Sequence, residues 1–254
     1  MKKTPIVVGN WKMKLNLKES IKLAKQLKKT IKRTKGKIEV GVCPSYTSLY
    51  SVSATLAGSQ IKLGAQDMFW EETGAFTGEI SPLMLRDYGC QMVIIGHSER
   101  RQNLGETDAM VHKKIKTALN QKLLPILCVG EDFQQRSENQ TDYVVIQQVT
   151  KALEGIDLKE DDKIVIAYEP VWVIGSGQAI EPEETEHVHN LINHILIDLF
   201  ADNLVKTNFR IIYGGSVDST NVNLFTDLDI TDGVLVGNAS LEAEEFVKIV
   251  NKVK

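Results

Sequence analysis

The sequence predicts an α/β fold, a closed (β/α)8 barrel in which eight parallel strands are surrounded by outer helices. Short runs of β-forming residues alternate with longer segments of helical periodicity along the whole chain. Such alternation is typical of parallel strands joined by right-handed crossovers. A length of 254 residues suits one barrel of this kind. No linker or break in composition divides the chain, so we expect a single barrel domain over residues 1–254.

Short, mostly apolar runs are predicted as the strands. In chain order they are Ile6–Gly9, Glu39–Cys43, Lys62–Ala65, Met92–Gly96, Leu124–Val129, Ile164–Tyr168, Phe209–Tyr213 and Gly233–Val236. An open, doubly wound sheet is the alternative. It is weakened because no Gly-x-Gly-x-x-Gly motif, the mark of a dinucleotide-binding sheet, follows the first run.

Helices are predicted where apolar residues recur at steps of three and four. The clearest helix covers Glu181–Phe200, with Pro182 at a first-turn position. Two more cover Thr107–Gln121 and Thr141–Leu153, the second with Ile146 among its inward-facing residues.

A further amphipathic segment near the start of the chain carries lysines on one face and apolar residues, beginning with Leu17, on another. The lysines are Lys18, Lys22, Lys25, Lys29 and Lys32. Because no aromatic residues are interleaved with them, we expect a solvated helix face rather than a nucleic-acid patch.

The composition is that of a globular protein, with 43% hydrophobic residues, 25% charged residues and a net charge of −3. We expect no nucleic-acid partner and no membrane span. No signal-peptide pattern opens the chain, and Cys43, Cys90 and Cys128 are too far apart for a disulfide framework. We therefore expect a cytoplasmic protein with reduced, mostly buried thiols and, since no histidine ligand set is evident, no metal.

The segment Ala167–Ala179 carries the strongest indication of function. A predicted strand ends on Glu169, Pro170 blocks a helical continuation, and an apolar stretch leads to Gly175-Ser-Gly177. A carboxylate at the mouth of a strand is a candidate base, the apolar stretch a candidate lid, and the glycines a candidate anion cradle. Together they predict proton transfer on an anionic small molecule; a surface loop of chance composition is the alternative.

Polar residues follow other predicted strands, at the end where barrels carry their chemistry. Asn10 and Lys12 follow the first strand, Gln66 the third and His97 the fourth. His97 would begin a helical turn whose positive end disfavours the charged imidazole, so a neutral ring could donate to a carbonyl. Lys12 could hold an anion, with Glu99 as its counter-charge. The alternative for each is a structural or surface residue.

Two turns of small residues follow the last two predicted strands. They are Gly214-Gly-Ser216 and Gly237-Asn-Ala-Ser240. Barrels often bind phosphate at this position through backbone N–H groups, so both turns together indicate phosphate binding.

Six motifs, in order and at compatible spacing over the whole chain, resemble the triosephosphate isomerase family. They are Gly9-Asn-Trp-Lys-Met13, Gly74-Ala-Phe-Thr-Gly-Glu-Ile-Ser81, Ile95-Gly-His-Ser-Glu-Arg-Arg101, Cys128-Val-Gly-Glu131, Ala167-Tyr-Glu-Pro-Val-Trp172 and Tyr213-Gly-Gly-Ser-Val217. The resemblance implies a TIM-barrel isomerase of glycolysis and gluconeogenesis. Such an enzyme interconverts dihydroxyacetone phosphate and D-glyceraldehyde 3-phosphate through an enediol(ate), without a cofactor. A glutamate base and a neutral histidine under a closing lid are the known pattern of this enzyme.

The resemblance also implies a role for each site residue. Glu169 would take the carbon-bound proton, and His97 would polarise the carbonyl and shuttle hydroxyl protons. Lys12 and Asn10 would hold the substrate, with Glu99 and Cys128 in support. The phosphate would be held by backbone N–H groups of Gly175, Ser216, Gly237 and Asn238. The lid would comprise Pro170, Val171, Trp172, Val173, Ile174, Gly175, Ser176, Gly177 and Gln178.

Members of the family are usually homodimers in which the loop after the third strand docks into the neighbour. Here that loop, residues 67–78, has a large apolar load in Met68, Phe69, Trp70 and Phe76. We therefore expect a homodimer; packing of the loop on its own barrel is the alternative. The expected dimer contacts include Met13, Phe76, Thr77 and Glu79.

Three positions depart from the commoner family pattern. Asn238 stands where glycine is usual, Gln178-Ala-Ile180 stands where Lys-Thr-Ala is usual, and Lys14 replaces a frequent asparagine. Asparagine tolerates a positive φ, so we expect a modest effect at Asn238. Two other functions stay open: another phosphate-binding barrel enzyme such as a lyase or aldolase, and a non-catalytic relative.

Overall fold

The computed structural model describes residues 3–31, 38–174 and 180–253. Its eight strands form one closed barrel in chain order, with every neighbouring pair parallel. They are β1 (Ile6–Asn10), β2 (Glu39–Cys43), β3 (Ile61–Ala65), β4 (Met92–Ile95), β5 (Leu124–Val129), β6 (Ile164–Tyr168), β7 (Phe209–Tyr213) and β8 (Gly233–Val236). The predicted barrel is confirmed, and the open sheet is wrong because β8 pairs with β1.

Strand bounds differ from the prediction by one residue at most. β1 extends to Asn10 and β3 begins at Ile61. β4 ends at Ile95 rather than Gly96, because Gly96 has a φ of 74°, outside the β region. The strands are almost wholly buried on both faces, as expected for parallel strands covered by helices.

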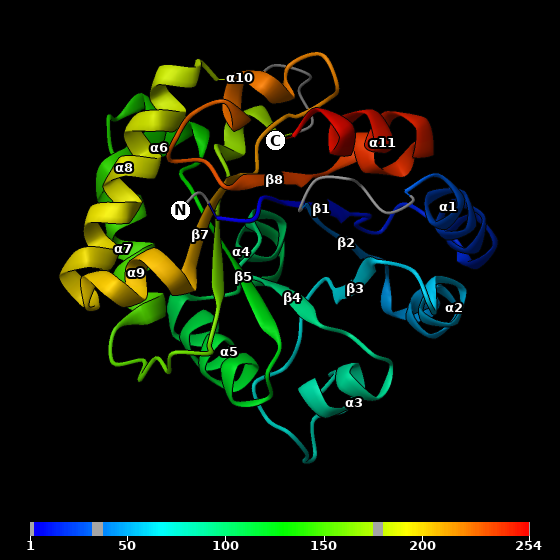
Figure 1. The fold of residues 1–254 in the computed structure, drawn as a ribbon. Helices are drawn as coiled ribbons and strands as arrows, with labels where there is room; N and C mark the ends of the chain where they lie inside the picture. The colour runs from blue at the N-terminus through cyan, green and yellow to red at the C-terminus, as the bar shows by residue number, and fades with distance from the viewer. Residues whose placement is uncertain (1–2, 32–37, 175–179, 254) are drawn as a thin grey trace.

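Helices surround the barrel on the outside (Figure 1). They are α1 (Leu17–Thr30), α2 (Tyr46–Leu56), α3 (Pro82–Asp87), α4 (Ser98–Leu104), α5 (Asp108–Asn120), α6 (Phe133–Ser137), α7 (Thr141–Leu153), α8 (Pro182–Leu199), α9 (Asp202–Asn208), α10 (Val222–Thr226) and α11 (Ala243–Lys252), with short 3-10 helices η1 (Val171–Val173) and η2 (Asn238–Leu241). None of the helices in the described ranges is long and apolar enough to cross a membrane.

The predicted helices are confirmed, with two corrections to their faces. In α1 a capping box between Asn16 and Glu19 fixes the start, and the described lysines of the predicted stripe face solvent. Leu17 is 45% exposed, because burial in α1 starts only at Ser20. In α7 Ile146 is 42% exposed, because it lies one step of about 100° beyond Val145 on the buried stripe.

Alternation along the strands produces two apolar layers. One layer consists of strand residues alone, among them Val8, Met92 and Ala167, and therefore fills the barrel interior. The other joins strand and helix residues between the barrel and its outer ring. Met92 occupies the space left by Gly64, since a Cβ added there would come within 2.6 Å of the Met92 Cγ. The packed interior leaves the strand ends as the place for a site.

Candidate active site

A cavity of about 260 Å³ opens at the carboxyl ends of the strands. Its lining residues are Asn10, Lys12, His97, Glu169, Ile174, Gly214, Gly215, Ser216, Val217, Asp218, Leu235, Gly237, Asn238 and Ala239. The cavity thus brings together every predicted catalytic residue and all the predicted phosphate-binding residues except Gly175. Gly175, Ser176, Gly177 and Gln178 lie outside the described residues.

Glu169 is a buried carboxylate at the end of β6, only 1% exposed. Its Oε2 accepts a hydrogen bond of 3.1 Å from the backbone N–H of Ser98. Its Oε1 is buried and has no hydrogen-bond partner within the described part of the chain. A buried carboxylate oxygen without a hydrogen bond is available to a ligand that supplies a donor.

His97 approaches that same oxygen from α4, of which it is the N-cap residue. Its Nδ1 accepts a hydrogen bond of 3.2 Å from the backbone N–H of Glu99. A ring nitrogen that accepts carries no proton, so the proton of a neutral imidazole is on Nε2. Nε2 lies 3.2 Å from Oε1 of Glu169. The pair can therefore exchange protons with a small molecule in the cavity.

Lys12 has a φ of 50°, a left-handed conformation that the sequence did not predict. Its backbone N–H donates to Oδ1 of Asn10 over 3.0 Å, and its carbonyl accepts from Nε2 of Gln66 over 2.8 Å. Gln66 therefore supports Lys12 and is not among the residues that line the cavity. The ammonium of Lys12 donates to Oε1 of Glu99 over 2.8 Å, so the predicted counter-charge is present.

The two small-residue turns form one wall of the cavity. Gly215 has no room for a side chain, since a Cβ there would lie 2.2 Å from the hydroxyl oxygen of Tyr213. Asn238 begins η2, and it is not among the non-glycine residues of the described chain that adopt a positive φ. Asn238 therefore does not need the tolerance of asparagine for a positive φ on which the expectation was based.

Asp218 is an acidic residue in this wall that sequence reasoning missed. Its Oδ1 accepts from the backbone N–H groups of Thr220 and Asn221 over 2.7 and 3.2 Å. Hydrogen bonds from Thr220, partly offset by burial, lower the pKa of Asp218. These hydrogen bonds hold the ionised carboxylate against its own loop.

The start of the predicted lid is anchored by Glu131, a residue to which the sequence assigned no role. Trp172 of η1 donates from Nε1 to Oε1 of Glu131 over 3.0 Å, and Tyr168 donates its hydroxyl to Oε2 over 3.2 Å. Burial raises the pKa of Glu131, although these donors act against the rise. The position of Glu131 just after β5, at the barrel mouth, was the signal that could have identified it.

Cys128 lies beside the base candidate at the end of β5. Burial and the Glu169 carboxylate raise its pKa well above the ordinary thiol value, so the thiol stays protonated. Cys43 and Cys90 are also free and buried, which confirms that the thiols are buried. No cluster of three or more potential metal ligands occurs among the described residues.

The loop 67–78 packs partly on its own barrel. Met68 is fully buried, so for this residue the alternative of internal packing is right. Phe69 stacks on Trp70 with ring centroids 4.0 Å apart and contacts Phe76 at 4.6 Å. Phe76 is still 44% exposed and Met13 is 94% exposed. Thr77 and Glu79 are exposed as well.

Comparison with known proteins identifies relatives over nearly the whole chain. The family model described as Triosephosphate isomerase matches residues 5–253. The chain is 46% identical over 245 residues to a triosephosphate isomerase of Dictyoglomus turgidum, covering 96% of this chain and 98% of the relative. It is 47% identical over 247 residues to one of Caldanaerobacter subterraneus, covering 97% and 98%. It is 48% identical over 248 residues to one of a Thermoanaerobacter species, again covering 97% and 98%.

Proposed function

The chain belongs to the triosephosphate isomerase family and is an enzyme of that type, and on this premise we propose how its cavity performs the reaction. The substrates are dihydroxyacetone phosphate and D-glyceraldehyde 3-phosphate, which interconvert through an enediol(ate). The observation that carries the proposal is the buried Oε1 of Glu169. It accepts no hydrogen bond from the described chain, although Nε2 of His97 lies only 3.2 Å away.

Glu169 acts as the general base. It removes the proton from the carbon next to the carbonyl and returns it to the neighbouring carbon, which converts ketose to aldose. The bond from Ser98 to Oε2 leaves Oε1 available for this transfer. Because the carboxylate is only 1% exposed, little water competes for the abstracted proton.

His97 acts as the electrophile. Its Nε2–H donates to the carbonyl oxygen as negative charge develops there, and it then moves protons between the two oxygens of the enediol. The Glu99 N–H supports the neutral tautomer that this role needs.

Lys12 offsets the negative charge of the enediolate and of the phosphate, and Asn10 fixes the backbone from which Lys12 projects. The phosphate is held by backbone N–H groups of Ser216, Gly237 and Asn238, together with Gly175. The lid of residues 170–178 closes over the intermediate, which keeps water out and hinders loss of phosphate.

Two copies of the chain form a homodimer through the loop 67–78. The exposed Phe76, Thr77 and Glu79 and the nearly fully exposed Met13 support this assembly, since large exposed apolar groups mark interaction surfaces.

Replacement of Glu169 tests the proposed base. In a coupled assay on glyceraldehyde 3-phosphate, we expect Glu169→Gln to lower kcat/KM by about 1,000-fold or more, because an amide cannot accept the proton. Glu169→Asp keeps the carboxylate at a shorter reach and should lose less. Glu183→Gln, at an exposed glutamate of α8, is the matched control and should retain full activity.

Turnover of Glu169→Gln within about tenfold of the wild type would exclude Glu169 as the base. The two other functions that the sequence left open, a lyase or aldolase and a non-catalytic relative, receive no support from relatives that all carry the isomerase name.

A further inference from the structure

Glu169 lies between two cavities. Besides the cavity described above, a second one of about 290 Å³ opens beyond β5 and is lined in part by Ser98, Cys128, Gly130, Gln148 and Glu169. The Glu169 side chain is buried, and the backbone N–H of Ser98 holds its Oε2. Its position depends on Ser98 and on the main chain that carries it.

That main chain is bonded to the end of β5 at alternate residues. The backbone N–H of Glu169 donates to the carbonyl of Val129 over 2.7 Å, and that of Val171 donates to the carbonyl of Glu131 over 3.0 Å. Gly130, between these two acceptors, is bonded instead by one side chain. Oε1 of Gln148 accepts its N–H over 2.8 Å, and Nε2 of Gln148 donates to its carbonyl over 3.2 Å.

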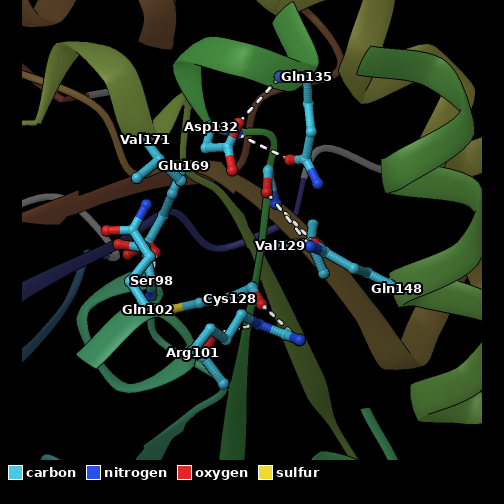
Figure 2. A pocket seen from close by; sticks show the side chains of 12 residues that line it. Ser98, Arg101, Gln102, Cys128, Val129, Asp132, Gln135, Gln148, Glu169 and Val171 are labelled. Carbon is cyan, nitrogen blue, oxygen red and sulfur yellow. Dashed lines mark hydrogen bonds between the residues drawn. The ribbon is translucent and has the colours of Figure 1, made fainter. Parts of the chain in front are cut away.

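Figure 2 shows the Gln148 side chain reaching toward the end of β5, with dashed lines marking its hydrogen bonds. Gln148 comes from α7, so a helix of the outer ring satisfies the two backbone groups of Gly130. One primary amide bonds both backbone groups of Gly130, because it has a donor and an acceptor side by side.

Gly130 in turn touches the backbone of Glu169 directly. A Cβ built on Gly130 would lie 1.8 Å from the carbonyl oxygen of Glu169, and Gly130 has a φ of 157°, where side chains are strained. No side chain separates the two backbones, so a displacement of Gly130 is transmitted to Glu169.

We propose that Gln148 is a positioning residue of the reaction: it holds Gly130 by both hydrogen-bonding groups and thereby fixes the backbone from which Glu169 reaches the substrate. The inference rests on the proposed role of Glu169 as the base. Gln148 lines the cavity away from the phosphate-binding turns, so its loss changes the chemical step and leaves substrate binding in place.

The test compares Gln148→Met, which keeps the length of the side chain but removes the amide, with Gln147→Met. Gln147 is the exposed neighbour on the same helix and serves as the matched control. We expect Gln148→Met to lower kcat by about 10- to 100-fold, as a misplacement near 1 Å does. We expect its KM and the inhibition constant of inorganic phosphate to stay within about twofold, because the binding turns are unchanged.

A double-mutant cycle separates positioning from general structural damage. With Glu169→Gln already present, Gln148→Met should cost less than about twofold more in kcat, because no base is left to misplace. The inference would be overturned if Gln148→Met and Gln147→Met had the same kcat. It would also be overturned if Gln148→Met lowered kcat by the same factor in the Glu169→Gln background as in the wild type. Substantial turnover by Glu169→Gln alone would instead refute the proposed base.

Gln148→Glu provides a second variant should Gln148→Met fail to fold, as judged by circular dichroism. The carboxylate still accepts the N–H of Gly130 but cannot donate to its carbonyl. A fall in kcat at unchanged KM is expected, and a wild-type kcat would overturn the inference.

Discussion

The Nζ atom of Lys12 lies 2.8 Å from Oε1 of Glu99, which ties the chain just after β1 to the start of α4 across the cavity mouth. The backbone N–H of the same Glu99 donates to Nδ1 of His97. Glu99 therefore contacts both the cation and the imidazole of the site. With Lys12 in its proposed role, a substrate anion would compete with the Glu99 carboxylate for the ammonium, so substrate binding would change the contacts of Glu99.

Replacing Lys12 by methionine should weaken anion binding more than it perturbs the fold. We expect the dissociation constant of inorganic phosphate to rise by more than about tenfold, which corresponds to one lost charge-assisted contact of about 1.4 kcal/mol. Isothermal titration calorimetry with inorganic phosphate gives this constant without the need for turnover. An unchanged value would show that the phosphate is held by the backbone turns alone.

Lys12→Gly separates the backbone of this residue from its charge. Glycine relieves the strain of a φ of 50° that methionine retains. We therefore expect the glycine variant to be at least as stable to urea as Lys12→Met, because relief of the strain offsets the larger unfolded-state entropy of glycine, while both lack activity. A glycine variant that is clearly less stable than Lys12→Met would show that the strain is small.

At Asn238 we expect that substitution by glycine has little effect on the kinetic constants and that substitution by proline has a large effect. Asn238→Gly keeps the N–H and should alter kcat/KM by less than about tenfold, or 1.4 kcal/mol. Asn238→Pro suits the first position of η2 but removes the N–H. Steady-state assays should therefore show a raised KM for proline alone. Equal KM values would exclude this N–H as a phosphate donor.

His189 should make stability depend on pH. Its Nδ1 lies 2.9 Å from Oγ1 of Thr231, and burial lowers its pKa to about 3. In the unfolded chain the ring titrates near about 6.5, so the unfolded state binds more protons between these values. The stability from neutral His189 is thus complete above pH 6.5 and is lost as the pH falls toward 3.

Urea unfolding between pH 7 and 5 measures this effect. Relative to His189→Asn, we expect the wild type to lose up to about 1.4 kcal/mol of unfolding free energy per pH unit below 6.5. His194→Asn, at an exposed position of the same helix, is the control and should keep the wild-type slope. Parallel curves for the wild type and His189→Asn would contradict a neutral buried imidazole.

Light scattering tests the proposed homodimer. We expect twice the mass of one chain for the wild type and a shift toward the monomer for Phe76→Asp, because a charge there opposes apolar burial. Phe133→Asp changes a phenylalanine that is 72% exposed on α6 and should leave the mass unchanged. A monomeric wild type at micromolar concentration would rule the assembly out.

Much of the barrel follows from local sequence. Ile164–Tyr168 is a short run of β-forming residues and could be recognised as a buried parallel strand without any knowledge of its neighbours. Helix α8 is marked by Pro182 and by its apolar spacing. Which residues of a helix are buried follows less directly from local sequence, as the exposed Ile146 shows. The exposure of a helix residue depends on which neighbouring element covers that helix and on how much of its surface is covered.

By itself the sequence determined the barrel, the family and the residues to examine, because strand periodicity and contiguous motifs such as Ile95–Arg101 are local properties. Only the tertiary structure decided which atoms meet. Oε1 of Glu169 lies next to His97, and Gln148 bonds Gly130, so in both cases segments distant in sequence meet. The left-handed backbone of Lys12 likewise is not marked by its local sequence. Such relations depend on barrel closure and on distances of a few ångströms, which no local pattern encodes.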